Sequence, residues 1–437
     1  MIFLILPNQL YDIGYLKNIG NIKHIMLWEC PHYFTAYAYN KKKLILHRAS
    51  MKAYYNMLSK KGYKISYVEF HEKLDENKEY LLYNPLDNPT LLGLPKNHKI
   101  VEDVIPNMLL TTKMLEEYRR NTKKFFFNAF YMWSKKKLGI IPGIKSQDKE
   151  NRLRIKNTIQ IRQPYDDIIA SKDVKEYVKE ASEYVLKHFP KNHGNVNEFM
   201  YPINRVDALK WLKHFIKYKF KNFGPYQDFI DKDDKHLYHS LLSSLLNIGL
   251  IGPHDVISML PKTGIPLNSY EGFIRQLFWR EYQYYCYRYF DFSGNYFGNN
   301  KKLGKEWYDA KVGIEPVDDA IKEAFDSGYL HHIKRLMVIG NYMNLSGISP
   351  KEGFRWFMEF SCDSYEWVMH QNVYEMVFCI SGGGTMRRPY ISSSNYIIKM
   401  SNYKKGDWCK IWDDKYKTFV TRNKRKLWKF RYYFRGI

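Results

Sequence analysis

Short runs of apolar residues alternate with amphipathic segments in the first part of the chain. The apolar runs span Ile2 to Leu6, His24 to Glu29, Ile65 to Phe70 and Tyr80 to Tyr83. Runs of this length, separated by helical patterns, are typical of a parallel sheet with crossover helices. We therefore predict a Rossmann-like α/β domain over residues 1–125.

A crossover helix is predicted between the second and third runs. Leu44, Met51, Tyr55 and Leu58 recur at helical spacing, and Gly62 supplies a stop signal. The segment therefore completes a βαβ unit.

Strand signals fade after about Met114, and helical patterns with short Gly or Pro interruptions follow. Pro142 and Gly143 break the pattern inside a polar connector, which we place at residues 126–193. Residues 194–437 are predicted to form a larger all-helical domain. Its helices are expected over residues 206–220, 233–250, 270–290, 317–343 and 350–360.

Length and composition narrow the class of protein. A chain of 437 residues is longer than one hydrophobic core usually serves, which supports two domains. No apolar run approaches the ~20 residues of a membrane span, and the opening MIFLILP is interpreted as a buried strand, not a signal peptide. The 5 cysteines are scattered and form no CxxC pair, which predicts no metal site and an intracellular location, in the cytoplasm or in a eukaryotic nucleus.

A large positive charge points to a polyanionic partner. Lys and Arg number 69 against 45 Asp and Glu, a net charge of +24, which favours DNA or RNA through counterion release. An AT-rich genome, which enriches lysine everywhere, is the alternative explanation. After Ser401 the chain carries 12 Lys and Arg against 3 Asp, interleaved with Trp and Tyr. Such a tail suits phosphates and exposed bases, although a solvated helix with an apolar underside fits as well.

Two segments of the helical part combine groups that suit an anionic, aromatic ligand. Ser240 and Ser243 lie beside a predicted helix start, where hydroxyls and free backbone N–H groups can bind a diphosphate. Gln276, Trp279 and Arg280 lie on neighbouring faces of one predicted helix, so they can line one cavity. A capped core helix and ordinary packing are the alternatives for the two segments.

Several sequence blocks in a fixed order match a known family. The helical part holds LSSLLNIGL, RQLFWREY and GYLHHIKRLM, and the flanking blocks are PNQL, HRASMKAYYNML, DKENR, EWVMHQNVYEM and RRPYISSSNYIIKMSNY. With these blocks the chain resembles the photolyase and cryptochrome family over nearly its full length. It is most similar to the bacterial photolyase-related branch that repairs (6-4) photoproducts and usually carries an iron–sulfur cluster.

The resemblance implies that FAD lies folded in the helical domain. Asn372 is expected closest to flavin N5, with a helix cap as its alternative role. The other cofactor-binding residues that the resemblance implies are Tyr226, Ser240, Leu242, Ser243, Arg280 and Asp363.

The resemblance also implies a pocket that binds UV-damaged DNA. We expect the protein to be a monomer. His332 matches the histidine that contacts the lesion, and an imidazole with an ordinary pKa of ~6.5 can pass a proton while the flavin passes an electron. Gln276, Trp279 and Met376 complete the expected lesion pocket. Gln276 favours (6-4) photoproducts over cyclobutane dimers, and Leu336 agrees with the bacterial branch.

Electron transfer to the flavin is expected to use Trp356 as the inner residue, with Trp307 and Tyr390 outside it. The resemblance further implies an antenna chromophore in the first domain, a lumazine in the bacterial branch. Glu29 and Cys30, after the second strand, are its expected contacts.

The chain departs from the bacterial branch where that branch binds its cluster. Lys404 and Asp407 replace two cluster cysteines, the first ligand position falls near Pro316 and Val317, and Cys409 alone cannot supply the about four thiolates that a cluster needs. We therefore predict no iron–sulfur cluster.

These expectations define a deoxyribodipyrimidine photolyase-type lyase. It would repair UV-induced pyrimidine photoproducts, (6-4) photoproducts foremost, by electron transfer from excited reduced FAD with His332 as proton donor. The alternatives are a cryptochrome-like blue-light photoreceptor without repair activity, a cyclobutane-dimer photolyase, and a nucleic-acid-binding module without redox chemistry, which would be colourless.

Overall fold

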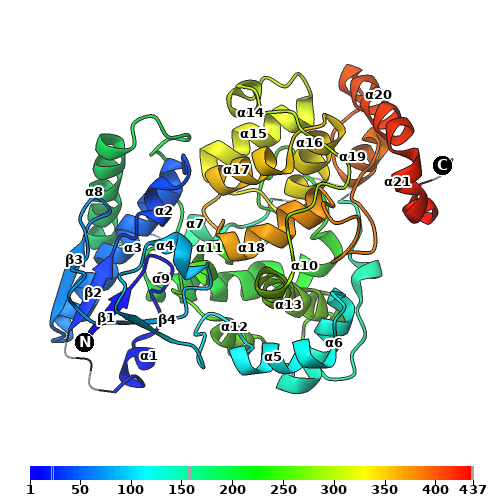
Figure 1. The fold of residues 1–437 in the computed structure, drawn as a ribbon. Coiled ribbons are helices and arrows are strands. Elements are labelled where there is room, and N and C mark those ends of the chain that lie inside the picture. The colour runs from blue at the N-terminus through cyan, green and yellow to red at the C-terminus, as the bar shows by residue number, and fades with distance from the viewer. Residues whose placement is uncertain (21, 23, 156–159, 169, 435–437) are drawn as a thin grey trace.

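The N-terminal part is built on a parallel sheet, as the apolar runs predict. The computed structural model describes residues 1–20, 22, 24–155, 160–168 and 170–434. The strands pair in the order β3-β2-β1-β4-β5, all parallel. Their bounds are β1 Ile2–Ile5, β2 Ile25–Trp28, β3 Ile65–Val68, β4 Tyr80–Tyr83 and β5 His98–Val101. Figure 1 shows this sheet on one side of the molecule, with the helical part beside it.

The edge strand β5 is missing from the sequence prediction. It pairs with β4 from Tyr80↔His98 to Tyr83↔Val101, and its residues remain partly exposed. An edge strand at this position needs no continuous apolar run, so HKIV gives a weak strand signal.

Helices of the N-terminal part cover the sheet. The predicted crossover helix is α3 (Lys41–Lys60), which starts where the Asn40 side chain accepts a hydrogen bond from the Lys42 backbone N–H. Its strongest helical neighbour is α8 (Lys172–His188), and Figure 1 shows the two side by side. The shorter helices are α1 Ile13–Lys17, α2 His32–Thr35 and α4 Pro89–Leu92. Helix α5 (Thr112–Asn121) lies away from the sheet (Figure 1), where its Tyr118 packs against Phe130 and Tyr285.

The segment predicted as a connector is largely helical. Its first helix, α6 (Phe127–Leu138), packs on α13 (Leu267–Tyr289) of the helical part, whereas α8 packs on α3 of the sheet domain. Between them lie η1 (Asp148–Glu150) and α7 (Pro164–Asp167). The two long helices therefore belong to different halves of the molecule.

Helices joined by loops make up the C-terminal part among the residues that the structure describes, which confirms the predicted fold class. Three of its segments, η2, η3 and η4, are π-helical, a rare geometry that is frequent at functional sites. None of the described helices is both long and apolar enough to cross a bilayer. The elements are α9 Arg205–His214, η2 Phe215–Lys219, α10 Phe220–Tyr226, α11 Ser243–Asn247, α12 Pro253–Met259, α13, α14 Glu306–Asp309, α15 Glu315–Ser327, η3 Lys334–Gly340, α16 Asn341–Leu345, α17 Pro350–Phe360, α18 Glu366–Met369, η4 His370–Val377, α19 Ser394–Met400, α20 Asp407–Arg422, α21 Lys424–Leu427 and η5 Trp428–Tyr433.

The prediction of a helix over residues 233–250 was wrong for the first half of that range. Only α11 forms, because Leu237 and Leu241 adopt positive φ values of 42° and 57°, which no helix accommodates. The Asp234 carboxylate instead accepts hydrogen bonds from the His236 and Leu237 backbone N–H groups, which stabilises a turn.

The helix predicted over 317–343 is divided. Helix α15 ends at Gly328, whose φ of 70° is the left-handed conformation that favours glycine at a helix end. The chain then turns, and η3 begins at Lys334. The turn places His331 just before the helical segment that leads into η3, and His332 in its first turn.

Candidate active site

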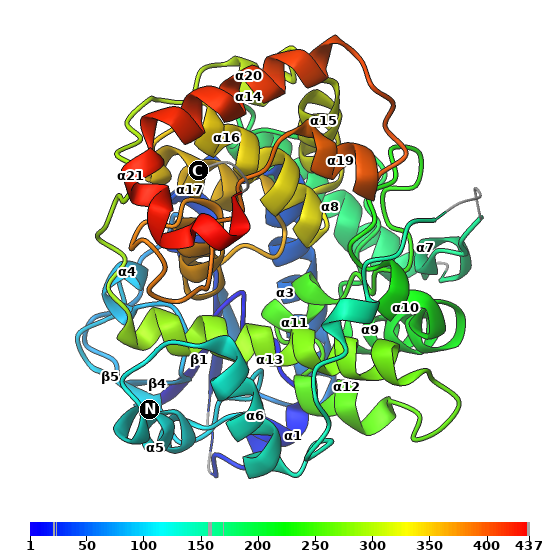
Figure 2. The same ribbon diagram turned by 90° about the vertical axis from the view of Figure 1, so that its right-hand side faces the viewer.

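A cavity of about 290 Å³ lies in the helical part. It is lined by α13, the 239–243 segment, the turn before η3, and η3 and η4. Figure 2 shows α13 and α11 near the middle of this side of the molecule. The predicted site residues that line the cavity are Ser240, Leu242, Ser243, Gln276, Trp279, Arg280, His332, Asp363 and Asn372.

Of the residues predicted to bind the cofactor or the lesion, two are not among the cavity-lining residues. Tyr226 stacks on Tyr238 with ring centroids 5.6 Å apart, in a small separate cluster. Met376 is buried on η4. Leu336, one turn after His332, does line the cavity.

Arg280 brings a buried positive charge to the cavity. Its Nε donates to Asn247 Oδ1 at 2.9 Å, and its Nη1 donates to the Asn107 carbonyl oxygen at 2.5 Å. Within the described chain its hydrogen bonds all go to neutral oxygen or sulfur atoms. Burial lowers the pKa of Arg280 to about 10, so the side chain remains charged at neutral pH. An anionic ligand would balance this charge.

Glu281, the next residue on α13, connects the helix to the N-terminal part through hydrogen bonds. Its carboxylate accepts hydrogen bonds from the Leu109 N–H at 2.9 Å and the Leu110 N–H at 3.1 Å. Burial raises the pKa of Glu281 to about 7. Arg280 and Glu281 together therefore bind four consecutive positions of the chain beyond β5, residues 107–110.

Arg335 and Asp363 form an ion pair at the cavity wall. Arg335 Nη1 and Nη2 donate to the two Asp363 carboxylate oxygens at 2.8 and 3.1 Å, and Ser361 also donates to Asp363. Burial alone would raise the pKa of Asp363, but Arg335 outweighs burial and holds the pKa below its ordinary value. The sequence interpretation missed Arg335, although it lies only two residues after the HHI segment.

His332 is in its neutral form in this cavity. The His332 ring is accessible where it borders the cavity, and protein surrounds the cavity at this point. Loss of hydration and the nearby Arg335 charge lower the pKa of His332 to about 4. The proton-donor role expected of His332 therefore needs a negative group beside it, which a phosphate would supply.

Two further histidines line the cavity and were not predicted. His239 and His331 have ring centroids 4.6 Å apart. Both ring nitrogens of His331 and the Nε2 atom of His239 lack a hydrogen-bond partner among the described residues. Burial lowers the pKa of His239 to about 3 and that of His331 well below its ordinary value. Both rings are therefore neutral at pH 7.

Asn372 presents an unsatisfied acceptor. Its Nδ2 donates to the Val368 carbonyl oxygen at 2.8 Å, whereas its Oδ1 is buried and has no partner in the part of the chain described. Because Asn372 lies inside η4, it does not cap a helix. Its oxygen suits a ligand that donates an N–H group.

An aromatic pair lies beside exposed Gln276 at the rim. Trp279 is half-buried and stacks on Phe127 of α6, with ring centroids 3.7 Å apart and an angle of 8° between planes. Gln276 donates to Gln227 Oε1 at 3.2 Å. The stacked pair holds the Trp279 ring in one orientation, as a surface for a planar ligand requires.

The predicted tryptophans lie next to one another behind the cavity. Trp356 is fully buried, contacts Phe357 of the cavity wall, and donates its indole N–H to the Trp307 carbonyl oxygen at 2.9 Å. Buried rings continue from Trp307 to Tyr342 at 6.2 Å and from Tyr342 to Trp412 at 4.9 Å. Sequence alone did not indicate these two further rings. Tyr390 lies elsewhere, below the Arg388 guanidinium at 5.6 Å.

Buried neutral histidines predict acid sensitivity. Burial lowers the pKa of His236 to about 3, and the unfolded chain has the ordinary pKa of ~6.5. Below pH ~6.5 the unfolded state therefore binds more protons, and the free energy of unfolding should fall by up to about 1.4 kcal/mol per pH unit for such a residue. Denaturant titrations from pH 7 to 4 should show a shallower decline for His236→Asn than for the natural chain, and equal slopes would contradict the assignment.

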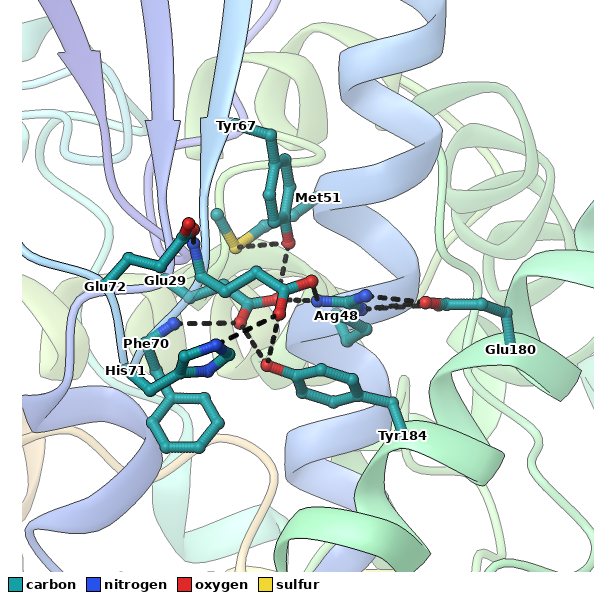
Figure 3. Close-up of polar contacts among 10 residues, drawn as sticks. Glu29, Arg48, Met51, Tyr67, Phe70, His71, Glu72, Glu180 and Tyr184 are labelled. Carbon is teal, nitrogen blue, oxygen red and sulfur yellow. Dashed lines mark hydrogen bonds and ion pairs between the residues drawn. The ribbon is translucent and has the colours of Figure 1, made fainter.

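The crevice expected for the antenna is filled by protein groups. Glu29 Oε1 accepts hydrogen bonds from Arg48 and Tyr67, and Oε2 accepts from the Phe70 N–H and from Tyr184. Four donors occupy the about four lone-pair sites of this fully buried carboxylate. Figure 3 shows the network.

Cys30 is also engaged, because it is fully buried and donates to the Leu92 carbonyl oxygen at 3.3 Å. Neither Glu29 nor Cys30 therefore fits a bound chromophore. Arg48 instead joins Glu29, Glu69 and Glu180, at 2.9, 2.8 and 2.6 Å, and so connects β2, the end of β3 and α8.

Replacing Arg48 by methionine should strongly destabilise the N-terminal part. The change leaves the buried Glu29 carboxylate without its cation, which costs about 3–5 kcal/mol. Glu180→Gln is the matched control, because this partner is half exposed and should cost less than about 1 kcal/mol. Urea unfolding followed by circular dichroism measures both, and equal losses would argue against the network.

The cysteines lie apart from one another. Cys30, Cys286, Cys362 and Cys379 are buried, and Cys409 on α20 is partly buried. Within the described ranges, no group of three or more His, Cys, Asp or Glu side chains is arranged to hold a metal ion. The absence of an iron–sulfur cluster stays a prediction.

Similarity to solved structures defines the architecture. A bacterial class III photolyase from Agrobacterium tumefaciens matches with a TM-score of 0.57 at 15% identity, covering 97% of this chain and 91% of that one. An archaeal photolyase from Sulfolobus tokodaii, solved with two FAD molecules, matches with a TM-score of 0.55 at 12% identity, covering 97% of this chain and all of that one, 100%. The chain thus has the two-domain fold of photolyases.

Sequence similarity to photolyases covers parts of the chain. A family model described as "Deoxyribodipyrimidine photo-lyase-related protein" matches residues 3–88 and 94–201. A (6-4) photolyase from Agrobacterium fabrum is 37% identical over 269 residues, which are 57% of this chain. The matched region spans 53% of that relative, about half its length. Part of this chain is therefore similar in sequence to the photolyase-related family.

Proposed function

We propose that this protein is a light-dependent DNA lyase that repairs UV-induced pyrimidine photoproducts, with (6-4) photoproducts as its main substrate. The observation that carries the proposal is the composition of the cavity. Arg280 is a buried cation that makes no hydrogen bond to a carboxylate of the described residues, and Asn372 has an unsatisfied acceptor. His332 and the stacked Trp279 ring line the same cavity. The relative named (6-4) photolyase supports the same substrate.

The cavity fits FAD. Arg280 suits the negative charge of a diphosphate, and the cavity is also lined by Ser240, which precedes α11, and by Ser243, its first residue. Asn372 Oδ1 suits an N–H group of the flavin ring. Bound FAD would supply an electron donor that light excites. We place Tyr226, Leu242 and Asp363 in support of these contacts; Tyr226 acts from outside the cavity lining.

The protein's own groups would receive the damaged dinucleotide flipped out of the duplex. Gln276 offers an amide at the rim, Trp279 a stacking surface, and Met376 apolar packing behind the wall. His332, neutral in the free protein, would take up a proton as a DNA phosphate approaches and then donate it to the lesion. Trp356, Trp307 and Tyr390 are proposed to carry electrons between FAD and the surface.

The remaining parts of the proposal concern the whole protein. UV-damaged DNA is the partner, and the net charge of +24 should make its binding weaken steeply with salt. We propose a monomer in a reducing intracellular compartment, because all 5 cysteines are free. A lumazine-like antenna would need contacts other than Glu29 and Cys30.

Absorption and repair measurements test the function. The purified protein should be yellow, and blue light should restore an oligonucleotide carrying a (6-4) photoproduct, with no reaction in the dark. A colourless protein would indicate a nucleic-acid-binding module. A yellow protein that repairs neither lesion would indicate a photoreceptor, and preference for a cyclobutane dimer would overturn the (6-4) assignment. Several iron atoms per chain would overturn the absent cluster.

A further inference from the structure

The C-terminal end of the chain has two aromatic faces, of which only one is covered. We call residues Arg422–Phe434 the C-terminal platform; it comprises the end of α20, α21 and η5. One face packs on the protein, with Leu427, Phe430 and Phe434 exposed by 0%, 4% and 4%. The opposite face carries three open rings, Trp428, Tyr432 and Tyr433, exposed by 55%, 85% and 48%.

The platform is fixed to the helical part. Lys429 Nζ donates to the Gly382 carbonyl oxygen at 2.7 Å, and the Tyr296 hydroxyl donates to the Lys426 carbonyl oxygen at 2.9 Å. Gly382 follows η4, the segment that carries Asn372 at the cavity wall. Figure 2 shows α21 and the segment after it on the side of the molecule where α13 is seen. The exposed rings therefore lie on a surface that hydrogen bonds fix to the helical part.

Arginines lie over the open rings. The Arg431 guanidinium is 5.2 Å from the centre of the Trp428 ring and 4.7 Å from that of Tyr432. Arg388 lies 5.1 Å from the centre of the Tyr433 ring. Alternating cations and rings provide charge for phosphates and flat surfaces for bases.

A second cavity of about 360 Å³ adjoins the platform. It is lined by Phe297, Gly298, Arg422, Asn423, Arg425 and Lys426, three of them cationic and none acidic. Arg422 donates to Asn299 Oδ1 at 3.2 Å, and no hydrogen bond or ion pair joins Arg425 to the residues that the structure describes. The three acidic residues after Ser401 all lie in α20, at positions 407, 413 and 414, before the platform begins. The cavity thus suits an anionic group such as a phosphate.

We propose that the C-terminal platform binds unpaired DNA, with bases stacked on Trp428 and Tyr432 and a phosphate in the cavity beside Arg425. Bases in a duplex already stack on one another, so open rings gain most from an unpaired stretch. Extruding a damaged dinucleotide creates such a stretch in the opposite strand. The inference rests on DNA as the partner in the proposed function and adds a second contact outside the lesion cavity.

Binding of undamaged single strands to the full chain tests the proposal. The probes are a fluorescent oligo(dT) and a matching abasic oligonucleotide, which keeps the phosphates and lacks the bases. Trp428→Ala/Tyr432→Ala should weaken oligo(dT) binding by about 5- to 100-fold per stacked base and leave abasic binding unchanged. Arg425→Gln should weaken both probes and lower the slope of log affinity against log salt by about 0.7.

Matched controls lie on α8 and just after it. Leu186→Ala removes an apolar side chain that is 49% exposed, and Lys191→Gln removes an exposed charge. Both should leave oligo(dT) affinity unchanged. If the double variant unfolds at lower temperature, Tyr432→Ala alone serves, because this ring is almost entirely open.

Three results would overturn the platform. They are an unchanged oligo(dT) affinity in the double variant, an equal loss on the abasic probe, or a change in self-association with DNA affinity intact. Flavin absorption and lesion repair are read separately, so failure of the platform is distinguishable from failure of the proposed function.

Discussion

The His332→Ala protein is expected to remain yellow and to lose repair by about 10²- to 10⁴-fold, the usual contribution of a positioned proton donor. His332 borders the cavity with an open ring surface, so its removal opens space and breaks no described hydrogen bond that shapes the fold. The measurement is the rate of (6-4) photoproduct repair under blue light with substrate in excess.

Controls separate chemistry from structure. His254→Ala removes an exposed histidine on α12 and should leave repair unchanged. Because the protonated ring is the active form, repair in the natural protein should fall as pH rises through the pKa that His332 has with DNA bound. A rate that rises with pH across this range, or repair that survives in His332→Ala, would contradict the assignment.

Asp363→Ala is expected to be among the most destabilising single changes in the helical part. It leaves the Arg335 guanidinium largely buried without its carboxylate, which costs about 3–5 kcal/mol in free energy of unfolding. The change should also weaken cofactor retention, since both side chains line the cavity. Urea unfolding and flavin release on dilution measure the two effects.

A double variant that lacks both charges tests whether the loss of stability in Asp363→Ala comes from the unpaired charge of Arg335. Arg335→Met/Asp363→Leu removes both charges and should be more stable than Asp363→Ala, because an apolar pair needs no compensation. Asp75→Asn is the control for an ion pair with Lys78 in which both partners are half exposed, and it should leave the urea unfolding midpoint nearly unchanged. A double variant as unstable as the single one would show that shape, not charge, matters at this wall.

The sheet could be predicted because its central strands are buried on both faces and their sequences are continuous apolar runs. The edge strand β5 and the 231–242 turn could not be predicted in the same way. Their conformations depend on a neighbouring strand and on backbone hydrogen bonds to Asp231 and Asp234, which no hydrophobic period reports.

Much of the cavity was predicted from ordered sequence blocks, and what was missed depends on contacts between distant segments. Arg335 meets Asp363 across 28 positions, and Asn247 meets Arg280 across 33. For the predicted antenna contacts, Glu29 and Cys30, the difference is of another kind, because the sequence suggested a ligand site where the structure shows contacts within the protein. Glu29 lies at the end of a parallel strand, where ligands often bind, but Arg48 from α3 and Tyr184 from α8 fill its surroundings.

The bonds from α13 to the chain beyond β5 have a consequence for how the two domains can be separated. Arg280 is oriented by the Asn107 carbonyl, and Glu281 by the N–H groups of Leu109 and Leu110, all of which belong to the first 125 residues. A fragment of residues 194–437 would expose a buried acid and release the cation that faces the ligand. The helical domain therefore cannot be exchanged between relatives as an independent module, and substitutions at positions 107–110 and 280–281 should be tolerated only in matched combinations.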